Sequence, residues 1–133
     1  MVAWSMMHVA EIQSALDVLE LRRFRDENGR ELFDVAGAPL PDAATPAPVR
    51  FLPKWDNVLL AFADRTRVLP DEHRKTVIKM NGDVAQTFLV DGFVAGTWRV
   101  ETGRVVAEPY APLSRAARRE LAEEAGRLEV FLS

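Results

Sequence analysis

Four two-residue segments that end in glycine constrain the fold of this chain more than any other feature. They are Asn28-Gly29, Asn81-Gly82, Asp91-Gly92 and Thr102-Gly103. An Asn-Gly or Asp-Gly pair between apolar segments indicates a tight β-hairpin turn, because the turn positions need a positive φ that these residues tolerate. We therefore predict that hairpins, and not parallel strands, organise most of the 133 residues.

Three apolar segments surround the last two of these turns and predict a meander of antiparallel strands. The segments are 84–90, 93–100 and 104–110. Gly96 lies inside the middle segment, where a glycine indicates a bend or a β-bulge.

Three further short apolar runs precede the meander. They are 49–52, 57–62 and 65–69. We interpret each run as a strand, because each is short, apolar and bounded by Pro or Asp. Together with the meander they predict a curved antiparallel sheet of five or six strands, or a small β-barrel.

Two amphipathic helices are predicted at the ends of the chain. Residues 8–19 have apolar side chains at helical spacing, and strand-like segments 20–25 and 30–35 follow around Asn28-Gly29. A helix followed directly by a hairpin matches the recognition helix and wing of a winged-helix module. Near the C-terminus, Ser114 is the expected N-cap of a helix whose apolar stripe covers the sheet.

The sequence thus predicts an α+β chain in three parts. These are a partial winged-helix element over 1–37, a proline-rich linker over 38–50, and a small barrel or curved sheet with its covering helix over 51–133. Only seven residues precede His8, too few for the two earlier helices of a winged-helix module. We therefore expect either a fragment or a shortened relative of a longer protein.

Composition excludes some classes of site and partner. The chain has no cysteine, so neither a disulfide nor a thiolate metal site is expected, and no cofactor is predicted. No run approaches the roughly 18 apolar residues of a membrane span, and the N-terminus lacks the pattern of a signal peptide. We expect a cytoplasmic protein without a membrane partner.

Catalytic patterns are absent from the sequence. The chain has two histidines, His8 and His73, and no motif for a nucleophile elbow, a P-loop or a zinc protease. A hydrolase that uses Asp64, Asp71 or His73 is the weakest hypothesis. Asp71 and His73 belong to a charged run, which more often forms a solvated turn than a metal site.

Two basic clusters are candidate contacts for DNA phosphates, although the 17 Lys and Arg against 20 Asp and Glu argue against strong autonomous binding. The first cluster of predicted contacts, on the expected wing, is Arg22, Arg23 and Arg25, with Arg30 beside them. The second cluster is Arg65, Arg67, Arg74 and Lys75, in a basic group that also includes Lys79. Acidic residues interleave with both, so a solvated surface of mixed charge is the alternative in each case. The second cluster is the better electrostatic candidate.

From about residue 30 to its C-terminus, the sequence resembles a family of bacterial DNA-binding proteins. The segments that carry the resemblance are 39–70, with its Phe-Leu-Pro, Trp-Asp-Asn and Ala-Asp-Arg order, and 79–98, with Val-Asp-Gly and Gly-Thr-Trp. They resemble the C-terminal region of winged-helix DNA-glycosylase-like proteins. That family includes enzymes that unhook interstrand crosslinks and confer resistance to azinomycin-type alkylating antibiotics. The resemblance implies a concave DNA-binding surface made of winged helices and a small barrel.

The family's catalytic residues do not carry over to this chain. Their motif, as the resemblance implies it, is Gln, an aliphatic residue, then Gln or Asp. Here Gln13 precedes Ser14-Ala15 and Gln86 precedes Thr87-Phe88. A His-aliphatic-Pro motif is also absent, because Val9-Ala10 follows His8 and Arg74-Lys75 follows His73. A glycosylase must bind a flipped nucleotide and activate water, and no residue can be assigned to that step.

The prediction is therefore a non-catalytic module that binds duplex DNA through backbone contacts. The alternative is a structural or interaction domain that does not itself bind DNA. Its partners would be N-terminal winged-helix domains or a second copy of the chain.

Overall fold

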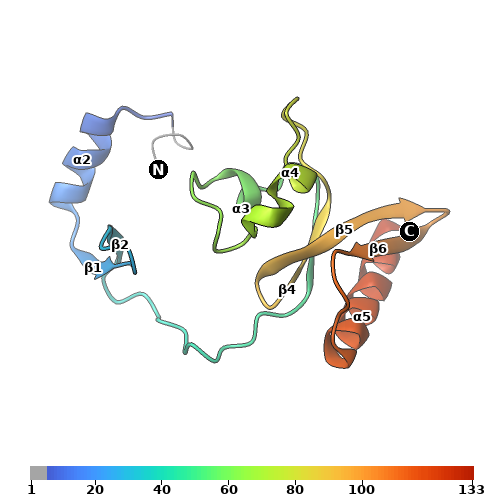
Figure 1. The fold of residues 1–133 in the computed structure, drawn as a ribbon. Coiled ribbons are helices and arrows are strands. Elements are labelled where there is room, and N and C mark those ends of the chain that lie inside the picture. The colour runs from blue at the N-terminus through green and yellow to red at the C-terminus, as the bar shows by residue number, and fades with distance from the viewer. Residues whose placement is uncertain (1–5) are drawn as a thin grey trace. The chain divides into compact units, whose positions relative to one another are not determined.

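The computed structural model describes residues 6–133 and divides the chain into two compact units, Met1–Thr45 and Pro46–Ser133. Each unit contains one antiparallel sheet, so the fold is a mixed α+β arrangement with two sheets (Figure 1). Residues 1–5, the start of the expected element 1–37, lie outside the described residues.

Between residues 6 and 45, the N-terminal unit has one helix and one hairpin, in the predicted order. Helix α2 (Val9–Val18) precedes strands β1 (Leu21–Arg25) and β2 (Glu31–Val35). The Glu11 carboxylate accepts a hydrogen bond of 2.8 Å from the His8 backbone N–H, which fixes the first turn of α2. The strands pair with Leu21 opposite Val35 and Arg25 opposite Glu31.

Asp26 organises the loop between these strands. Its Oδ1 accepts hydrogen bonds from the N–H groups of Asn28 (2.9 Å) and Arg30 (2.8 Å). Only Gly29 has a positive φ, 75°, among the described residues of the loop, whereas the sequence analysis expected it of Asn28 as well. The hairpin turn is therefore a five-residue loop, 26–30, that an aspartate holds, and not a two-residue Asn-Gly turn.

Among residues 6–45, the N-terminal unit has no apolar side chain that is fully buried. The apolar residues of α2 are half-buried or exposed, as are those of the hairpin. Burial of apolar side chains supplies most of the stability of a folded domain. This unit is therefore weakly stabilised compared with the rest of the chain.

The C-terminal unit is built on a four-stranded antiparallel sheet in the order β3-β4-β5-β6. Its strands are β3 (Arg50–Leu52), β4 (Thr87–Val90), β5 (Phe93–Glu101) and β6 (Arg104–Pro109). The predicted tight turns are present at Asp91-Gly92, with φ of 51° and 79°, and at Thr102-Gly103, with φ of 49° and 76°. Within residues 6–133 the edge strands do not pair with each other, so the sheet is open and no barrel closes.

Two of the expected strands are not strands. Residues 57–62 contain a short helix, α3 (Asn57–Leu60), because the Asp56 carboxylate caps it by accepting the Val58 N–H at 2.8 Å. Residues 65–69 form turns, and the Val68 carbonyl accepts the Val94 N–H at 2.8 Å. Both runs are apolar because Leu59 and Leu69 are buried in the core, and an apolar run alone does not distinguish a strand from a helix.

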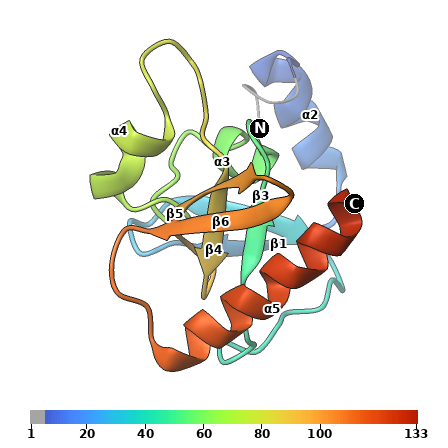
Figure 2. The same ribbon diagram turned by 90° about the vertical axis from the view of Figure 1, so that its right-hand side faces the viewer.

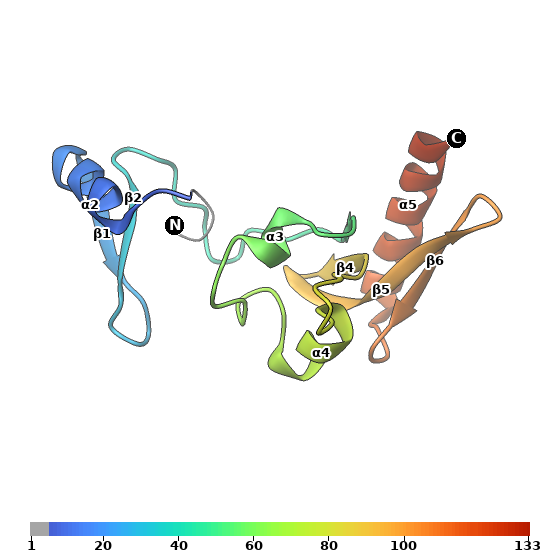
Figure 3. The ribbon, with the colours of Figure 1, turned by 90° about the horizontal axis from the view of Figure 1, so that it is seen from above.

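Apolar clusters lie on both faces of the sheet. On one face, beside α3 and the short segment η1 (Asp71–His73) with α4 (Arg74–Val77), the buried cluster includes Leu52, Leu59 and Val77. On the other face, Phe88 packs with Leu121 of helix α5 (Arg115–Leu132). Figures 2 and 3 show α5 across one face of the sheet, with α3 and α4 beyond the other.

Helix α5 begins as predicted, with the Ser114 hydroxyl accepting the Ala117 N–H at 3.1 Å. Its buried residues are Ala117 and Leu121, whereas Phe131, the last residue of the predicted stripe, is exposed. In the part of the chain that the structure describes, neither α5 nor any other helix combines the length and the apolar character that crossing a membrane requires.

Gly96 allows the sheet to bend, as its position in the sequence predicts. The pairing of β4 with β5 shifts between Phe88 and Leu89, so that Phe88 lies opposite Gly96 and Leu89 opposite Val94. The shift leaves Ala95 as the extra residue of a β-bulge. Phe88 occupies the space that a side chain at position 96 would need.

We expect Gly96→Ala to destabilise the protein by about 1–3 kcal/mol, because overpacking forces neighbouring groups to shift. The new Cβ would lie 2.5 Å from the Phe88 ring and would collide with the Glu108 carbonyl. Urea denaturation measures the change. Gly126→Ala is the control: nothing lies within 4 Å of its new Cβ, and in mid-helix it should stabilise by about 0.5–1 kcal/mol. Equal effects of the two substitutions would contradict this role of Gly96.

Candidate nucleic-acid interface

The two units differ in net charge. Residues 46–133 contain 13 Lys and Arg against 12 Asp and Glu, whereas residues 1–45 contain 4 against 8. The overall charge of −3 is therefore the sum of +1 in the C-terminal unit and −4 in the N-terminal unit. Phosphates respond to the local field of a surface, so the C-terminal unit is the more favourable place for an anionic ligand.

The arginines of the hairpin do not share one face. Side chains alternate along a strand, so Arg23 and Arg25 of β1 lie on one face and Arg22 lies on the opposite face. Arg23 donates to Glu31 at 2.9 Å, and its guanidinium lies 5.3 Å from the centre of the Phe33 ring. The hairpin therefore does not present three free cations side by side.

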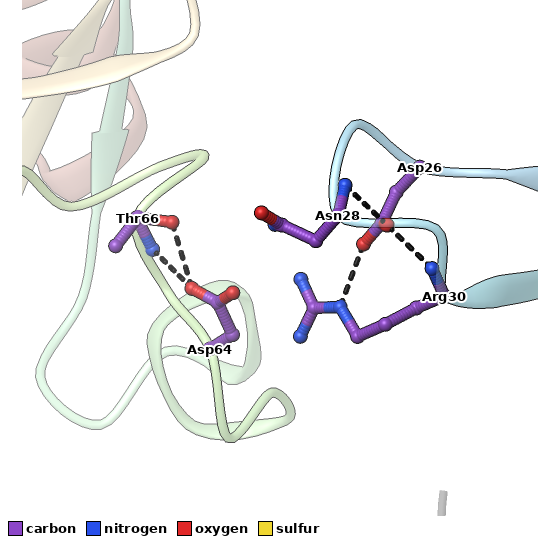
Figure 4. Close-up of polar contacts among 5 residues, drawn as sticks. All are labelled: Asp26, Asn28, Arg30, Asp64 and Thr66. Carbon is purple, nitrogen blue, oxygen red and sulfur yellow. Dashed lines mark hydrogen bonds and ion pairs between the residues drawn. The ribbon is translucent and has the colours of Figure 1, made fainter.

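The tip of the hairpin is acidic. The Arg30 guanidinium lies 2.6 Å from the Asp26 carboxylate. Desolvation raises the pKa of Asp26. Hydrogen bonds to its carboxylate from the N–H groups of Arg30 and Asn28, together with the Arg30 guanidinium, outweigh this effect, so the pKa is lowered overall (Figure 4). Asp26 therefore stays ionised at neutral pH and neutralises Arg30, and Glu27 adds a further negative charge to the loop.

Arg74 and Lys75 are the most available cations of the second cluster. Both lie in α4, and both side chains are exposed. Among the described residues, no carboxylate lies within 4.0 Å of either one. Arg67 is also exposed, in the turn that precedes Leu69.

Arg65, the fourth residue of this cluster, is half-buried and bonded to the backbone. Its Nε donates to the Leu59 carbonyl at the end of α3, and its Nη1 donates to the Ala63 carbonyl at 3.4 Å. Next to it, Asp64 accepts hydrogen bonds from the Thr66 N–H (3.1 Å) and hydroxyl (2.7 Å), as Figure 4 shows. The Asp64-Arg65 pair of the sequence motif thus holds the backbone of this loop.

His73 joins α4 to the chain that leads into α5. Its ring lies 4.3 Å from the Tyr110 ring, centre to centre, with an interplanar angle of 34°. Burial raises the pKa of the Tyr110 hydroxyl above its usual range. The sequence analysis did not identify Tyr110 as part of a site, because nothing in its neighbourhood marks a contact between residues so far apart in the chain.

The residues weighed for catalysis do not converge. Asp64 is bonded to Thr66, Asp71 is exposed at the start of η1, and His73 stacks on Tyr110. Among residues 6–133, no group of three His, Asp or Glu side chains is arranged to hold a metal ion.

The two glutamines are also far from any catalytic arrangement. Gln13 donates from its side chain to Asp17 at 3.1 Å, on the exposed surface of α2. Gln86 accepts the Trp98 N–H with its backbone carbonyl at 3.2 Å, beside the fully buried Thr87.

Comparison with known proteins identifies the family. The family model of AlkZ-like DNA glycosylases matches residues 1–131, nearly the whole chain. The DNA glycosylase AlkZ of Streptomyces sahachiroi has a similar structure, with a TM-score of 0.70 over 93% of this chain at 21% sequence identity. The alignment spans 34% of that protein, about one third of its length. The chain matches no curated protein. Because the family model covers almost every residue, the chain belongs to the AlkZ-like DNA glycosylase family.

Proposed function

We propose that this chain is a DNA-binding module without a catalytic centre of its own. It is the C-terminal part, or a shortened relative, of a winged-helix DNA-glycosylase-like repair protein, and its partner is duplex DNA. The observation that carries the proposal is the pair Arg74 and Lys75, exposed and without a carboxylate partner among residues 6–133. Membership of a DNA glycosylase family supports DNA as the partner.

The contacts we propose are to the phosphate backbone. Lys and Arg that neutralise phosphates supply affinity without reading sequence. In this proposal Arg67, Arg74 and Lys75 contact phosphates, and Arg65 supports them by holding the loop in place. The proposed domains remain a winged-helix element over 1–37, a linker over 38–50 and the sheet with its helix over 51–133.

The hairpin has a secondary role in this proposal. Helix α2 contains no Lys or Arg between Val9 and Val18, unlike a helix that reads DNA through its cations. Arg22 and Arg25 remain proposed peripheral contacts, whereas Arg23 is already neutralised by Glu31. In this proposal the wing adds backbone contacts of its own.

The double variant Arg74→Gln/Lys75→Gln tests the proposal. Binding of a labelled 20-base-pair duplex is measured by fluorescence anisotropy at several salt concentrations. Loss of two phosphate contacts should lower the slope of log affinity against log salt by about two units. Arg104→Gln is the control, because Arg104 is equally exposed but bound to Glu129 at 2.9 Å, and it should change the slope little. An unchanged slope in the double variant would rule out these two contacts.

Arg65→Gln separates a structural role from a phosphate contact. The substitution removes the hydrogen bonds of Arg65 to the Leu59 and Ala63 carbonyls. We expect a loss of about 1–3 kcal/mol in the free energy of unfolding, measured by urea titration, since a carbonyl loses a charged donor. Arg74→Gln should change it by less than about 0.5 kcal/mol. If the two variants are equally stable, the bonds of Arg65 do not hold the loop.

An apolar groove favours the second function, a structural or interaction domain. The groove, with a volume of about 300 Å³, lies between α2 and the hairpin. Its apolar lining includes Ile12, Leu16, Leu21 and Phe33, none of which is fully buried. Large exposed apolar patches mark interaction sites. In this second proposal the groove receives an apolar helix from preceding winged-helix domains or from a second copy of the chain.

Sedimentation velocity tests the groove with two neighbouring residues. Leu19 lines the groove and is 58% exposed, whereas Val18 is 84% exposed and does not line it. If copies associate through the groove, the sedimentation coefficient rises with concentration, Leu19→Glu abolishes the rise, and Val18→Glu preserves it. A concentration-independent monomer for the wild-type chain would exclude the second-copy form of this proposal.

A further inference from the structure

The start of α5 is unusually basic. Arg115, Arg118 and Arg119 lie in its first two turns, and no acidic residue precedes Glu120. The positive end of a helix dipole favours acidic side chains, so these arginines do not stabilise the helix. The end of the helix is already capped by Ser114, whose hydroxyl accepts the Ala117 N–H. Helix stability therefore does not account for the three cations.

Two of these arginines are not neutralised. Arg119 lies 3.7 Å from Glu123, one turn further along the helix. Arg115 and Arg118 are exposed, and within residues 6–133 no carboxylate lies within 4.0 Å of either side chain. They resemble Arg74 and Lys75 of α4 in both respects.

A ring contact joins the residue before α4 to the segment that leads into α5. Tyr110 stacks on His73, and Arg74 and Lys75 directly follow His73 in the chain. Tyr110 and Arg118 line one shallow hollow of about 380 Å³. In Figures 2 and 3, α4 lies beside the connection that leads from β6 into α5.

Most carboxylates around this stretch are bound to other groups. Glu108 accepts from Arg99, Glu120 accepts the Val49 N–H at 2.9 Å, and Glu72 lies 3.4 Å from His73. Asp71 and Glu72, which directly precede His73, are both exposed. The surface from α4 across Tyr110 to α5 thus has the four exposed cations Arg74, Lys75, Arg115 and Arg118 beside these two exposed carboxylates.

We propose that Arg115 and Arg118 are a second set of contacts to the DNA backbone, so that the DNA-binding surface extends from α4 across Tyr110 to the start of α5. This inference rests on the proposed function, and it enlarges the interface beyond the cations of the loops. Phosphates recur along a duplex at regular intervals, so one rod-shaped ligand can meet cations at both ends of such a surface.

The test compares three variants of the full chain in the anisotropy assay with the 20-base-pair duplex. Arg115→Gln/Arg118→Gln should lower the slope of log affinity against log salt by about two units. The control is Arg127→Gln, on the same helix but three turns away, where Arg127 lies 2.5 Å from Glu124. The control should retain the wild-type slope. Arg115→Lys/Arg118→Lys should restore binding, since it retains both charges.

The outcomes separate this inference from the proposed function. A wild-type slope in Arg115→Gln/Arg118→Gln, with a lowered slope in Arg74→Gln/Lys75→Gln, overturns the extended surface and leaves the DNA-binding function standing. No binding by the wild-type chain at low ionic strength overturns both. Arg115→Gln/Arg118→Gln should unfold at or above the wild-type unfolding temperature, because the substitution relieves repulsion between the arginines and the helix dipole. A loss of binding by this variant would therefore not be explained by unfolding.

Discussion

The contact between Phe88 and the bare backbone of Gly96 sets the geometry on which the C-terminal unit depends. Phe88 is completely buried opposite Gly96, and the pairing of β4 with β5 shifts beside it, which leaves Ala95 as a bulge. The Ala95 carbonyl accepts the Tyr110 N–H at 2.9 Å. The bulge thus positions Tyr110, which stacks on His73. A short series of direct contacts therefore connects Phe88 in the core with the charged surface.

The sheet separates two apolar clusters, one on each of its faces. Leu52, Val94 and Leu89 belong to the cluster beside α3 and α4, whereas Phe88 and Val49 belong to the cluster beneath α5. Because both faces are covered, the strands can be apolar on both sides, unlike a sheet with one wet face. The cations of α4 and α5 are held by elements that are anchored to opposite faces of this one sheet.

The sequence predicted those elements whose signals are local. The turns at Asp91-Gly92 and Thr102-Gly103 need a positive φ, and Ser114 marks the start of α5, so each could be predicted from a few neighbouring residues. The helix over Asn57–Leu60 was missed, because its apolar residues fit a strand equally well and the capping role of Asp56 was overlooked. Of the site, Arg22 and Arg23 were predicted as one cluster, although side chains that alternate along a strand place them on opposite faces. The contact of His73 with Tyr110 depends on tertiary packing alone.

The distribution of charge reconciles an acidic chain with a family of DNA-acting proteins. A net charge of −3 opposes DNA binding only if the charge is spread evenly, and here the excess of carboxylates lies in residues 1–45. The described part of that segment, residues 6–45, has no fully buried apolar side chain, and it contains the apolar groove. Screening at physiological salt restricts electrostatic effects to about 8 Å, so exposed cations of α4 and α5 respond mainly to their own surroundings. The acidic segment is therefore better suited to contact protein than phosphate, and the two functions we propose belong to different units of the chain.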